Sequence, residues 1–446
     1  MTKDLTRGTP WKLILQFALP IMLGNLLQQL YNTADTIIVG NFEGQQALSS
    51  VGACASLTIL FTALALGFSI GAGVLISQYF GAGRTEELRR YAATAIVLML
   101  AMGLVMSVIG LLSAELLLRG FLGTPETLLP QAVLYFRIYA AGLVFQFGYN
   151  IAAALLRALG DSRATLYFLL VSSVLNVVLD LLFVAVCGMG VAGAAIATVI
   201  SQLASCVIGF WYMHRKYELL RFSARELRPE AAVAGRILRV GLPMALQQSI
   251  VSCGFLFLQK LVNFYGESMI ASYTVASRME NILMIPIIGI QSTMATYAGQ
   301  NMGAKLPDRV SRGLGQGVLV SLLMTAALCL CQIAGISLII GAFRLDVAAA
   351  EICRQHLFAS AVAIPIFAVY FPANGMFQGV GEGFHATFYA LMALGLRVVF
   401  AYSLHKTAAF GYTAIWWSQA MAWTLTLIVC YAHFFRGKWK EKSLIA

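Results

Sequence analysis

The stretch from Gly44 to Gly83, GQQALSSVGACASLTILFTALALGFSIGAGVLISQYFGAG, contains no Asp, Glu, Lys or Arg. A helix needs about 20 consecutive apolar residues to cross a bilayer, whereas a transmembrane β-strand needs only about 10 with alternating polarity. An uncharged run of this length therefore indicates membrane-spanning helices and excludes a β-barrel. Further uncharged runs occur at residues 91–114, 181–213, 281–304, 313–343 and 407–435.

The composition agrees with a polytopic membrane protein. Of 446 residues, 60% are hydrophobic and 11% are charged, whereas soluble domains have about 25% charged residues. This excludes a soluble enzyme, and eight cysteines in a chain of this length are too few for a disulfide scaffold. We predict an all-α polytopic membrane protein with twelve transmembrane helices, near residues 13–39, 48–79, 91–112, 131–156, 164–186, 190–213, 237–262, 270–299, 313–340, 353–379, 384–404 and 411–435.

Lys and Arg concentrate in the loops on one side of these spans, from Lys3 near the N-terminus to Lys442 near the C-terminus. The opposite side has few of them, Arg344 being one. Cytoplasmic loops carry the excess of Lys and Arg, so both termini are predicted to be cytoplasmic in a multi-pass protein of the plasma (inner) membrane. The net charge of +11 is then an orientation signal, and we expect no nucleic-acid partner.

The cysteines and histidines do not lead us to expect a metal centre. The eight cysteines, Cys253 among them, are scattered through the spans and are interpreted as small buried side chains. The histidines are interpreted as single residues near span ends rather than as zinc or di-iron ligands. We expect no cofactor and no bound metal other than a coupling Na⁺.

The sequence matches itself at an offset of about 222 residues, which indicates an internal duplication. The matching segments are Leu19-Pro20 with Leu242-Pro243, Gln78–Ala82 with Gln300–Ala304, and Gly160 with Gly381. Each half holds six predicted spans and therefore begins and ends on the cytoplasmic side, so the halves are parallel repeats related by a pseudo-two-fold axis along the membrane normal. We predict a six-helix lobe at 1–213, a basic cytoplasmic linker at 214–236 and a second six-helix lobe at 237–446. Two such lobes are typical of a secondary transporter that works by alternating access.

Charged residues inside the spans are candidates for the functional site, because each costs at least about 3 kcal/mol in a bilayer. They are Asp35, Arg137, Asp180, Arg278, Glu280 and Arg397. In the repeat, Asp35 aligns with Leu258 and Asp180 with Ala401, so the acidic chemistry of the first lobe has no counterpart in the second. Arg278, Glu280 and Arg397 are interpreted as gating charges or as structural ion pairs.

The fifth and sixth spans offer a set of oxygen ligands. Asn176 and Asp180 are one helical turn apart and so present their side chains on one face. On the next span, Thr198 lies one turn after Ala194, where its hydroxyl can bond to the Ala194 carbonyl. Such a set suits Na⁺, and a protonated Asp180 could replace the ion. Asn176 is also consistent with an interhelical hydrogen bond, and Asp180 with a structural partner of Arg137.

A polar stripe on the first span is predicted to line the substrate cavity rather than to face lipid. Residues at spacings of three and four share one helix face, and the polar ones here are Gln28, Tyr31, Asn32 and Asp35. Asn150 of the fourth span is assigned to the same cavity. Asp35, near the outer end of its span, is also consistent with an interfacial position.

At these residues the chain resembles the multidrug and toxic compound extrusion family. The resemblance rests on Leu19-Pro20, Asp35–Gly40, Gln78–Gly83, Leu156–Asp161 and Gly299–Ala304. It implies cation-coupled export of organic, often cationic and amphipathic, compounds. The first lobe is similar to the branch of DNA-damage-inducible exporters, and this similarity implies a cation or proton site at Asn176, Asp180, Thr198 and Ala194, with Asp35 and Tyr31 on the first span.

We therefore predict an antiporter, not an enzyme, that acts as a monomer in the bilayer and exchanges a small organic substrate for Na⁺ or H⁺. A flippase for lipid-linked saccharides or lipids is the alternative, since Arg278 and Arg397 could meet phosphate. An intramembrane hydrolase or transferase is disfavoured, because the chain has no His-Glu-x-x-His motif.

Overall fold

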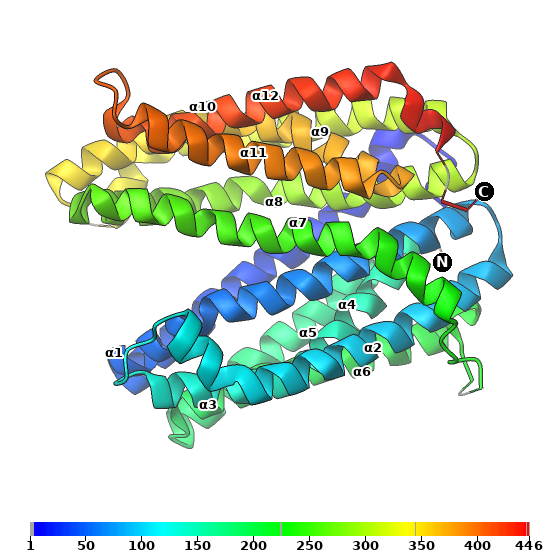
Figure 1. Ribbon diagram of the computed structural model, residues 1–446, viewed down its shortest axis with the longest axis horizontal. Helices are drawn as coiled ribbons and strands as arrows, with labels where there is room; N and C mark the ends of the chain where they lie inside the picture. The colour runs from blue at the N-terminus through cyan, green and yellow to red at the C-terminus, as the bar shows by residue number, and fades with distance from the viewer. Residues whose placement is uncertain (1–3, 224, 344, 443, 446) are drawn as a thin grey trace. The chain divides into compact units, whose positions relative to one another are not determined.

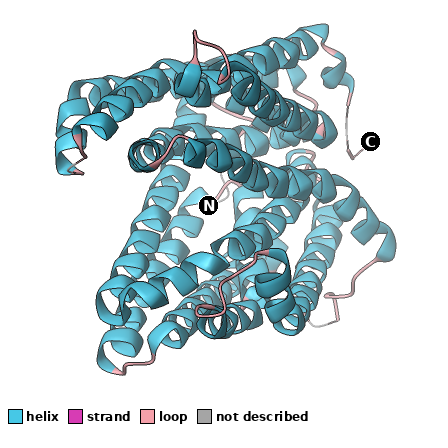
Figure 2. Cartoon of the chain, turned by 60° about the vertical axis from the view of Figure 1, so that its left-hand side comes forward, coloured by secondary structure: helices cyan, strands magenta, loops and turns pink. Residues whose placement is uncertain are grey.

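The structure, a computed structural model, describes residues 4–223, 225–343, 345–442 and 444–445, with only the backbone of 251–257. Lys3, Arg344 and the side chain of Cys253, which entered the sequence predictions, lie outside this description. The all-α prediction is confirmed, since no strand occurs in the described ranges (Figure 2). The helices are α1 (Pro10–Gly81), α2 (Thr85–Glu115), α3 (Leu129–Ala141), α4 (Leu143–Ala158), α5 (Ser162–Asp180), α6 (Gly190–Lys216), α7 (Ala231–Phe264), α8 (Glu267–Gly303), α9 (Pro307–Ala342), α10 (Val347–Val380), α11 (Gly383–Leu404) and α12 (Ala414–Arg436) (Figure 1).

Their lengths fit the predicted spans. In the described residues eight helices are long and apolar enough to cross a membrane, or nine if α3 and α4, which meet at 45°, form one bent span. Helix α1 holds two predicted spans because its backbone breaks at Gly44, whose φ of 79° is a conformation that favours glycine. Helices α7 and α12 lie at the predicted spans 237–262 and 411–435, so each of the twelve predicted spans corresponds to a helix, to part of one or to the bent pair α3 and α4.

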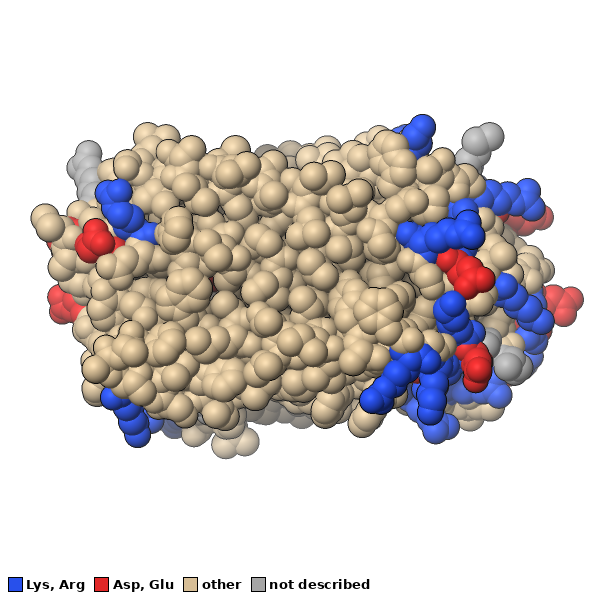
Figure 3. Space-filling model, turned by 90° about the horizontal axis from the view of Figure 1, so that it is seen from above, with Lys and Arg blue, Asp and Glu red and all other residues tan. Residues whose placement is uncertain are grey.

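The surface is that of a protein embedded in lipid. Figure 3 shows a broad uncharged surface over the middle of the helices, with Lys, Arg, Asp and Glu near the helix ends. Large apolar side chains such as Leu112, Leu323 and Leu338 are mostly exposed. In water such a surface would be costly, whereas in a bilayer it faces hydrocarbon. The chain is therefore a multi-pass membrane protein.

The chain forms two compact units. Unit 1 comprises Leu23–Ser249, and unit 2 comprises Asp4–Met22 together with Ile250–Ala446. Relative to the sequence repeat, the first parts of α1 and α7 are exchanged: each belongs to the unit that holds most of the other repeat. In unit 1, α4 packs against α2 and α6, while in unit 2 α10 packs against α8, α9 and α12 (Figure 1).

In unit 1 the first part of α7 crosses α1 at very close range. A Cβ placed on Gly67 would lie 2.2 Å from the Cα of Ala245, and one on Gly71 would lie 2.4 Å from the Cα of Gly241. This is the small-xxx-small arrangement by which membrane helices bring their backbones together. The letters Gly-Phe-Ser-Ile-Gly also match a nucleophile motif, but Ser69 is buried within the helix and donates to the Ala65 carbonyl at 2.7 Å, so no strand-to-helix turn presents it.

Unit 2 repeats this crossing with the first part of α1. A Cβ on Gly289 of α8 would lie 2.5 Å from Cγ of Met22. Gly289 aligns with Gly67, and Met22 aligns with Ala245, at the repeat offset. Farther along α8, a Cβ on Gly379 of α10 would lie 2.2 Å from the Ala295 carbonyl oxygen. Both units are thus held by helices that approach through glycine.

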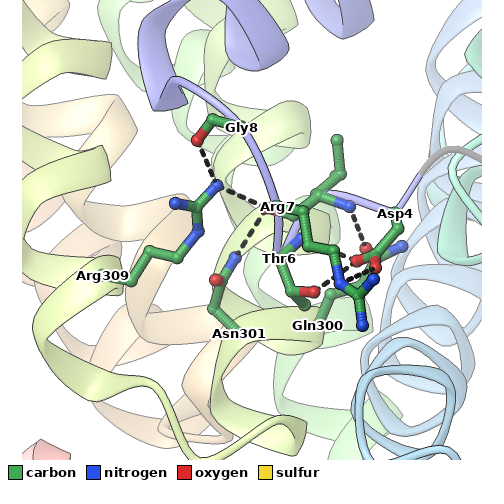
Figure 4. A network of polar contacts seen from close by, with 8 residues as sticks. Asp4, Thr6, Arg7, Gly8, Gln300, Asn301 and Arg309 are labelled. Atoms are coloured by element: carbon green, nitrogen blue, oxygen red, sulfur yellow. Dashed lines mark hydrogen bonds and ion pairs between the residues drawn. The ribbon is translucent and has the colours of Figure 1, made fainter.

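The segment before α1 is anchored in unit 2 (Figure 4). Leu5 is fully buried, and its N–H donates to Oε1 of Gln300 at 2.9 Å. Its carbonyl accepts from Asn301 at 3.3 Å and from Arg309 at 3.3 Å, and Arg309 also donates to the Gly8 carbonyl at 2.8 Å. Gln300 and Asn301 belong to the repeated Gln-x-x-Gly segment. In unit 2 this segment therefore holds the residues that precede α1.

The predicted linker 214–236 forms ion pairs with α2 in the part of the chain that the structure describes. Arg89 of α2 forms an ion pair with Glu226 at 2.6 Å, and Arg90 pairs with Glu230. The hydrogen bond from the Ser223 N–H, together with the Arg89 pair, holds the pKa of Glu226 at about 2. Both pairs are exposed, so we assign them an orienting role rather than a large share of stability.

Candidate functional site

Two of the predicted site residues are fully inside unit 1. Helix α5 carries Asn176 and Asp180 on its buried face, with exposed fractions of 2% and 0%. The helix then widens into a π-turn at Leu181–Val186, a feature that often marks functional positions. Both oxygens of Asp180 and both polar side-chain atoms of Asn176 are buried without a hydrogen-bond partner among the described residues.

Asp35 of α1 completes this cluster. Its carboxyl group lies near that of Asp180, and its Oδ1 is also buried without a hydrogen-bond partner in the described part of the chain. The buried Tyr135 of α3 lies within electrostatic range of both acids. Two adjacent carboxyl groups with buried oxygens that lack partners cannot both remain charged without a large cost. Sharing a proton or binding a cation would lower this cost.

The structure confirms the local geometry expected at the sixth span. The Thr198 hydroxyl donates to the Ala194 carbonyl at 3.0 Å. Ala194 is buried, Thr198 is half-buried, and α6 packs against α5 and the π-turn that follows Asp180. The hydroxyl oxygen of Thr198 keeps its lone pairs, so it remains able to accept a bond or to ligate an ion.

The polar stripe on α1 divides into an inner and an outer part. Tyr31 and Asp35 are half-buried in unit 1, whereas Gln28 and Asn32 are exposed on its surface. Gln28 interacts with the Tyr31 hydroxyl. Asn150 of α4 is buried, and its amide donates to the Gln146 carbonyl of its own helix at 2.8 Å. The structure thus places Tyr31 and Asp35 toward the acid cluster, and Gln28 and Asn32 away from the interior.

A buried polar ring was missed by the sequence analysis. Tyr139 of α3 donates to Oε1 of Gln146 at 3.0 Å, and the Gln146 amide donates to the Thr62 hydroxyl at 2.7 Å. The Thr62 and Tyr139 hydroxyls are 3.2 Å apart, which closes the ring. These residues are not charged and follow no recognisable spacing, so only the fold brings them together. The ring joins α1, α3 and α4 in the same unit as the acid cluster.

The predicted charges of the second lobe separate in unit 2. Glu280 of α8 lies 3.2 Å from Nε2 of His356 on α10 and within electrostatic range of Arg397. His356 is buried and stacks on Trp416 at 4.8 Å. Arg278 is exposed. Glu280, which is half-buried, therefore lies with the buried His356 and Arg397 in unit 2, and His356 is the member that the sequence analysis treated as a single histidine.

Each unit also contains an acid at the start of its fifth helix. In unit 1, Asp161 caps α5 through the Ala164 N–H at 3.1 Å and accepts from Lys216 at 3.0 Å and from Tyr212 at 2.9 Å. Burial raises the pKa of Asp161, but hydrogen bonds led by that from Tyr217 outweigh this effect and hold it below its usual value. The acid is a satisfied structural joint between α5 and the end of α6.

The corresponding acid in unit 2 is Glu382, before α11. Glu382-Gly-Phe-His385 is a Glu-x-x-His spacing that the sequence analysis overlooked. It lies beside His433 at the end of α12. The expectation that histidines occur only singly is therefore wrong at this position.

Comparisons with known proteins agree with this architecture. The MatE family model matches residues 20–182 and 243–403, one stretch in each copy of the repeat. The probable multidrug resistance protein YpnP of Bacillus subtilis is 33% identical over 307 residues, 69% of this chain and 68% of that protein. The multidrug export protein MepA of Staphylococcus aureus is 24% identical over 426 residues, 93% of this chain and 91% of that protein.

Solved structures extend the similarity to nearly the whole fold. An outward-facing structure of a multidrug resistance MATE family transporter has a TM-score of 0.92 at 26% identity and covers 99% of both chains. A transporter of the same superfamily from Pyrococcus furiosus, described as having a binding pocket of reverse polarity, has a TM-score of 0.87 at 27% identity and covers 99% of this chain and 98% of that chain. These relatives are transporters and not enzymes. With the family model matching both repeats and a relative at 33% identity, the chain belongs to the MATE family of transporters.

Proposed function

We propose that this protein is a secondary active antiporter that exports organic, cationic and amphipathic compounds in exchange for Na⁺ or H⁺. The observation that carries the proposal is the set of buried oxygens without hydrogen-bond partners at Asp35, Asn176 and Asp180, described above. The names of its relatives, which are multidrug resistance and multidrug export proteins, support the substrate class. In this proposal the protein acts as a monomer in the plasma membrane with both termini in the cytoplasm.

The proposed coupling follows from the charge of the acid cluster. Without a bound ion, Asp35 and Asp180 repel each other, and a proton or Na⁺ removes that repulsion. A cationic substrate can remove it too, so ion and substrate compete for the same negative charge. An ion gradient drives export only if the ion binds the inward-open and outward-open states with different affinity. We assign Thr198 and the Ala194 carbonyl to the same ion site, as in the branch of DNA-damage-inducible exporters.

Transport in proteoliposomes tests this function. A fluorescent organic cation is loaded, and Na⁺ and pH gradients are imposed separately. We expect Asp180→Asn and Asp35→Asn to abolish ion-driven efflux while the proteins still insert and purify as the wild type does. Glu115→Gln, which changes an exposed acid paired with Arg119 at 3.1 Å, is the matched control and should transport normally. Wild-type efflux in both cluster variants would refute the proposal.

A lipid or lipid-linked saccharide flippase is the second candidate, favoured by the buried Arg397 in unit 2. An arginine inside a membrane protein suits a phosphate group. Glu280 lies near Arg397 and offsets its charge, however, and we favour a cationic substrate because the cluster in unit 1 is acidic. A lipid-translocation assay run beside the dye assay separates the two, because only the flippase moves lipid without the organic cation.

A further inference from the structure

Three side chains of unit 2 converge at the junction of α11 and α12, away from the acid cluster of unit 1. Oε2 of Glu382 lies 3.3 Å from Nε2 of His433 and 3.7 Å from Nδ1 of His385. The three ligand atoms all lie within 4.8 Å of one another. In a tetrahedral zinc site with bonds of 2.0–2.1 Å, two ligand atoms are about 3.3 Å apart. The two distances from Oε2 are therefore close to the spacing of two ligand atoms around one small metal ion.

The surroundings orient these ligands. The hydroxyl of Tyr389 is hydrogen-bonded to Nδ1 of His433, which leaves Nε2 facing Glu382. A metal-bound histidine usually has such a partner on its other ring nitrogen. The Glu382 side chain is 1% exposed, and its Oε2 is buried without a hydrogen-bond partner among the described residues. The Glu382 side chain makes no capping hydrogen bond to α11, and its carboxylate contacts the histidines and Lys442 instead.

The first copy of the repeat has a corresponding junction, between α5 and α6, that is held together without histidines. Glu382 aligns with Asp161, His433 with Tyr212, and His385 with Ala164. In unit 1 the acid accepts hydrogen bonds from Tyr212, and the joint closes without an imidazole. The second copy therefore places two imidazoles where the first places a phenol and a methyl group. Holding α11 to α12 does not explain both histidines, whereas ligating a metal does.

The cluster is accessible. It lines a cavity of about 570 Å³ whose wall includes Phe388, Arg436, Lys438 and Lys442. The Lys442 ammonium lies 3.0 Å from Oε1 of Glu382, so it neutralises one carboxylate oxygen and leaves Oε2 to the histidines. The hard ions Ca²⁺ and Mg²⁺ prefer sites made entirely of oxygen ligands, whereas this site offers one carboxylate. Two imidazoles and one carboxylate oxygen instead suit Zn²⁺, with a fourth position open to water.

We propose that Glu382, His385 and His433 form a Zn²⁺ site that links the start of α11 to the end of α12. The ligands would be Oε2 of Glu382, Nδ1 of His385 and Nε2 of His433. Bound Zn²⁺ would stabilise unit 2 in proportion to its occupancy, because it binds the folded joint and not the separated helices. This site is independent of the transport site proposed in unit 1.

The test uses the full-length protein in detergent with any polyhistidine tag removed. Metal content is measured after dialysis against Zn²⁺, and thermal unfolding is followed with and without Zn²⁺. We expect one Zn²⁺ per chain and a rise in unfolding temperature. The double variant His385→Ala/His433→Tyr carries the residues that unit 1 uses at the same positions, and we expect it to fold but to lose both the bound Zn²⁺ and the rise. His214→Ala, at an exposed histidine, should retain both.

Two results overturn the proposal. One is a wild-type protein without stoichiometric Zn²⁺, and the other is a double variant that binds Zn²⁺ as the wild type does. Should the double variant not fold, Co²⁺ added to the wild type decides the question, because tetrahedral Co²⁺ has strong visible absorption. Absence of that absorption, or its persistence in Glu382→Gln, would then reject the site.

Discussion

Replacing Gly67 by alanine tests the close crossing of α1 and α7 within unit 1. The new Cβ would lie 2.2 Å from Cα and 2.4 Å from the backbone nitrogen of Ala245, and 2.7 Å from the carbonyl carbon of Met244. Carbon atoms in contact are about 3.5–4.0 Å apart. The obstacle is main chain and cannot rotate away, so the two helices must move apart by more than about 1 Å to reach that contact distance.

The expected cost follows from two opposing terms. Overpacking by added methyl groups costs up to about 3 kcal/mol, and alanine in place of glycine returns about 1 kcal/mol of helix propensity. We therefore expect Gly67→Ala to destabilise unit 1 by about 2 kcal/mol. A Cβ on Gly52, on the same helix, would meet nothing within 4 Å, so Gly52→Ala should gain the propensity term without the clash.

Thermal unfolding of both variants in one detergent measures the difference. The unfolding temperature should fall for Gly67→Ala and should stay constant or rise for Gly52→Ala. Equal unfolding temperatures for the two variants would refute the reasoning, because the two substitutions differ only in what the new methyl group meets. A lower unfolding temperature in both variants would show that the glycines matter for the flexibility of the helix and not for the crossing.

Three further substitutions probe the other joints. Asp161→Asn should lower the free energy of unfolding by about 2 kcal/mol at neutral pH, because hydrogen bonds to a charged group contribute that much. The pKa of Asp161 is depressed in the folded state, so its contribution to stability is complete above about pH 4 and is lost at lower pH. When unfolding is followed as the pH is lowered, the variant should therefore lose less stability than the wild type. Leu5→Ala should lower stability by about 2–5 kcal/mol in thermal unfolding, since the side chain is fully buried. His356→Phe keeps the stack on Trp416 but removes the hydrogen-bond partner of Glu280, at a cost of about 1–3 kcal/mol in thermal unfolding. Adding Glu280→Gln should recover most of this cost, and no recovery would show that the contact between Glu280 and His356 is unimportant.

The sequence predicted the helices and the inner part of the candidate site for a physical reason. In lipid every backbone group must be bonded within its own segment, so an uncharged run leaves only a helix. Asn176 and Asp180 are one turn apart, and that spacing alone places them on one face, which the structure buries. The break inside α1 also has a local signal, since Gly44 follows the charged Glu43 between two apolar runs.

The partners of these elements could not be predicted in the same way. The first part of α1 belongs to unit 2, where the side chain of Met22 fits against Gly289, and a fit of this kind leaves no periodic pattern in the sequence. His356 and Glu280 lie on different helices, so no spacing relates them. Glu382 and His385 do have a recognisable spacing, but their third partner, His433, comes from the far end of the next helix.

The duplication explains why the two units carry different chemistry on one scaffold. Each unit keeps an acid where its fifth helix begins, and in unit 1 Asp161 accepts from the Ala164 N–H, from the hydroxyls of Tyr212 and Tyr217 and from the Lys216 ammonium. Both oxygens of Asp161 already accept hydrogen bonds, and no imidazole of the described residues contacts them, whereas the joint at Glu382 presents imidazole nitrogens to a carboxylate oxygen. In the membrane interior it is unit 1 that carries the additional ion ligands. Its carboxyl groups, Asp35 and Asp180, align with apolar residues of unit 2. A buried charge is costly wherever it occurs, and a bound ion lowers that cost, so we infer one ion for transport in unit 1 and one for structure in unit 2.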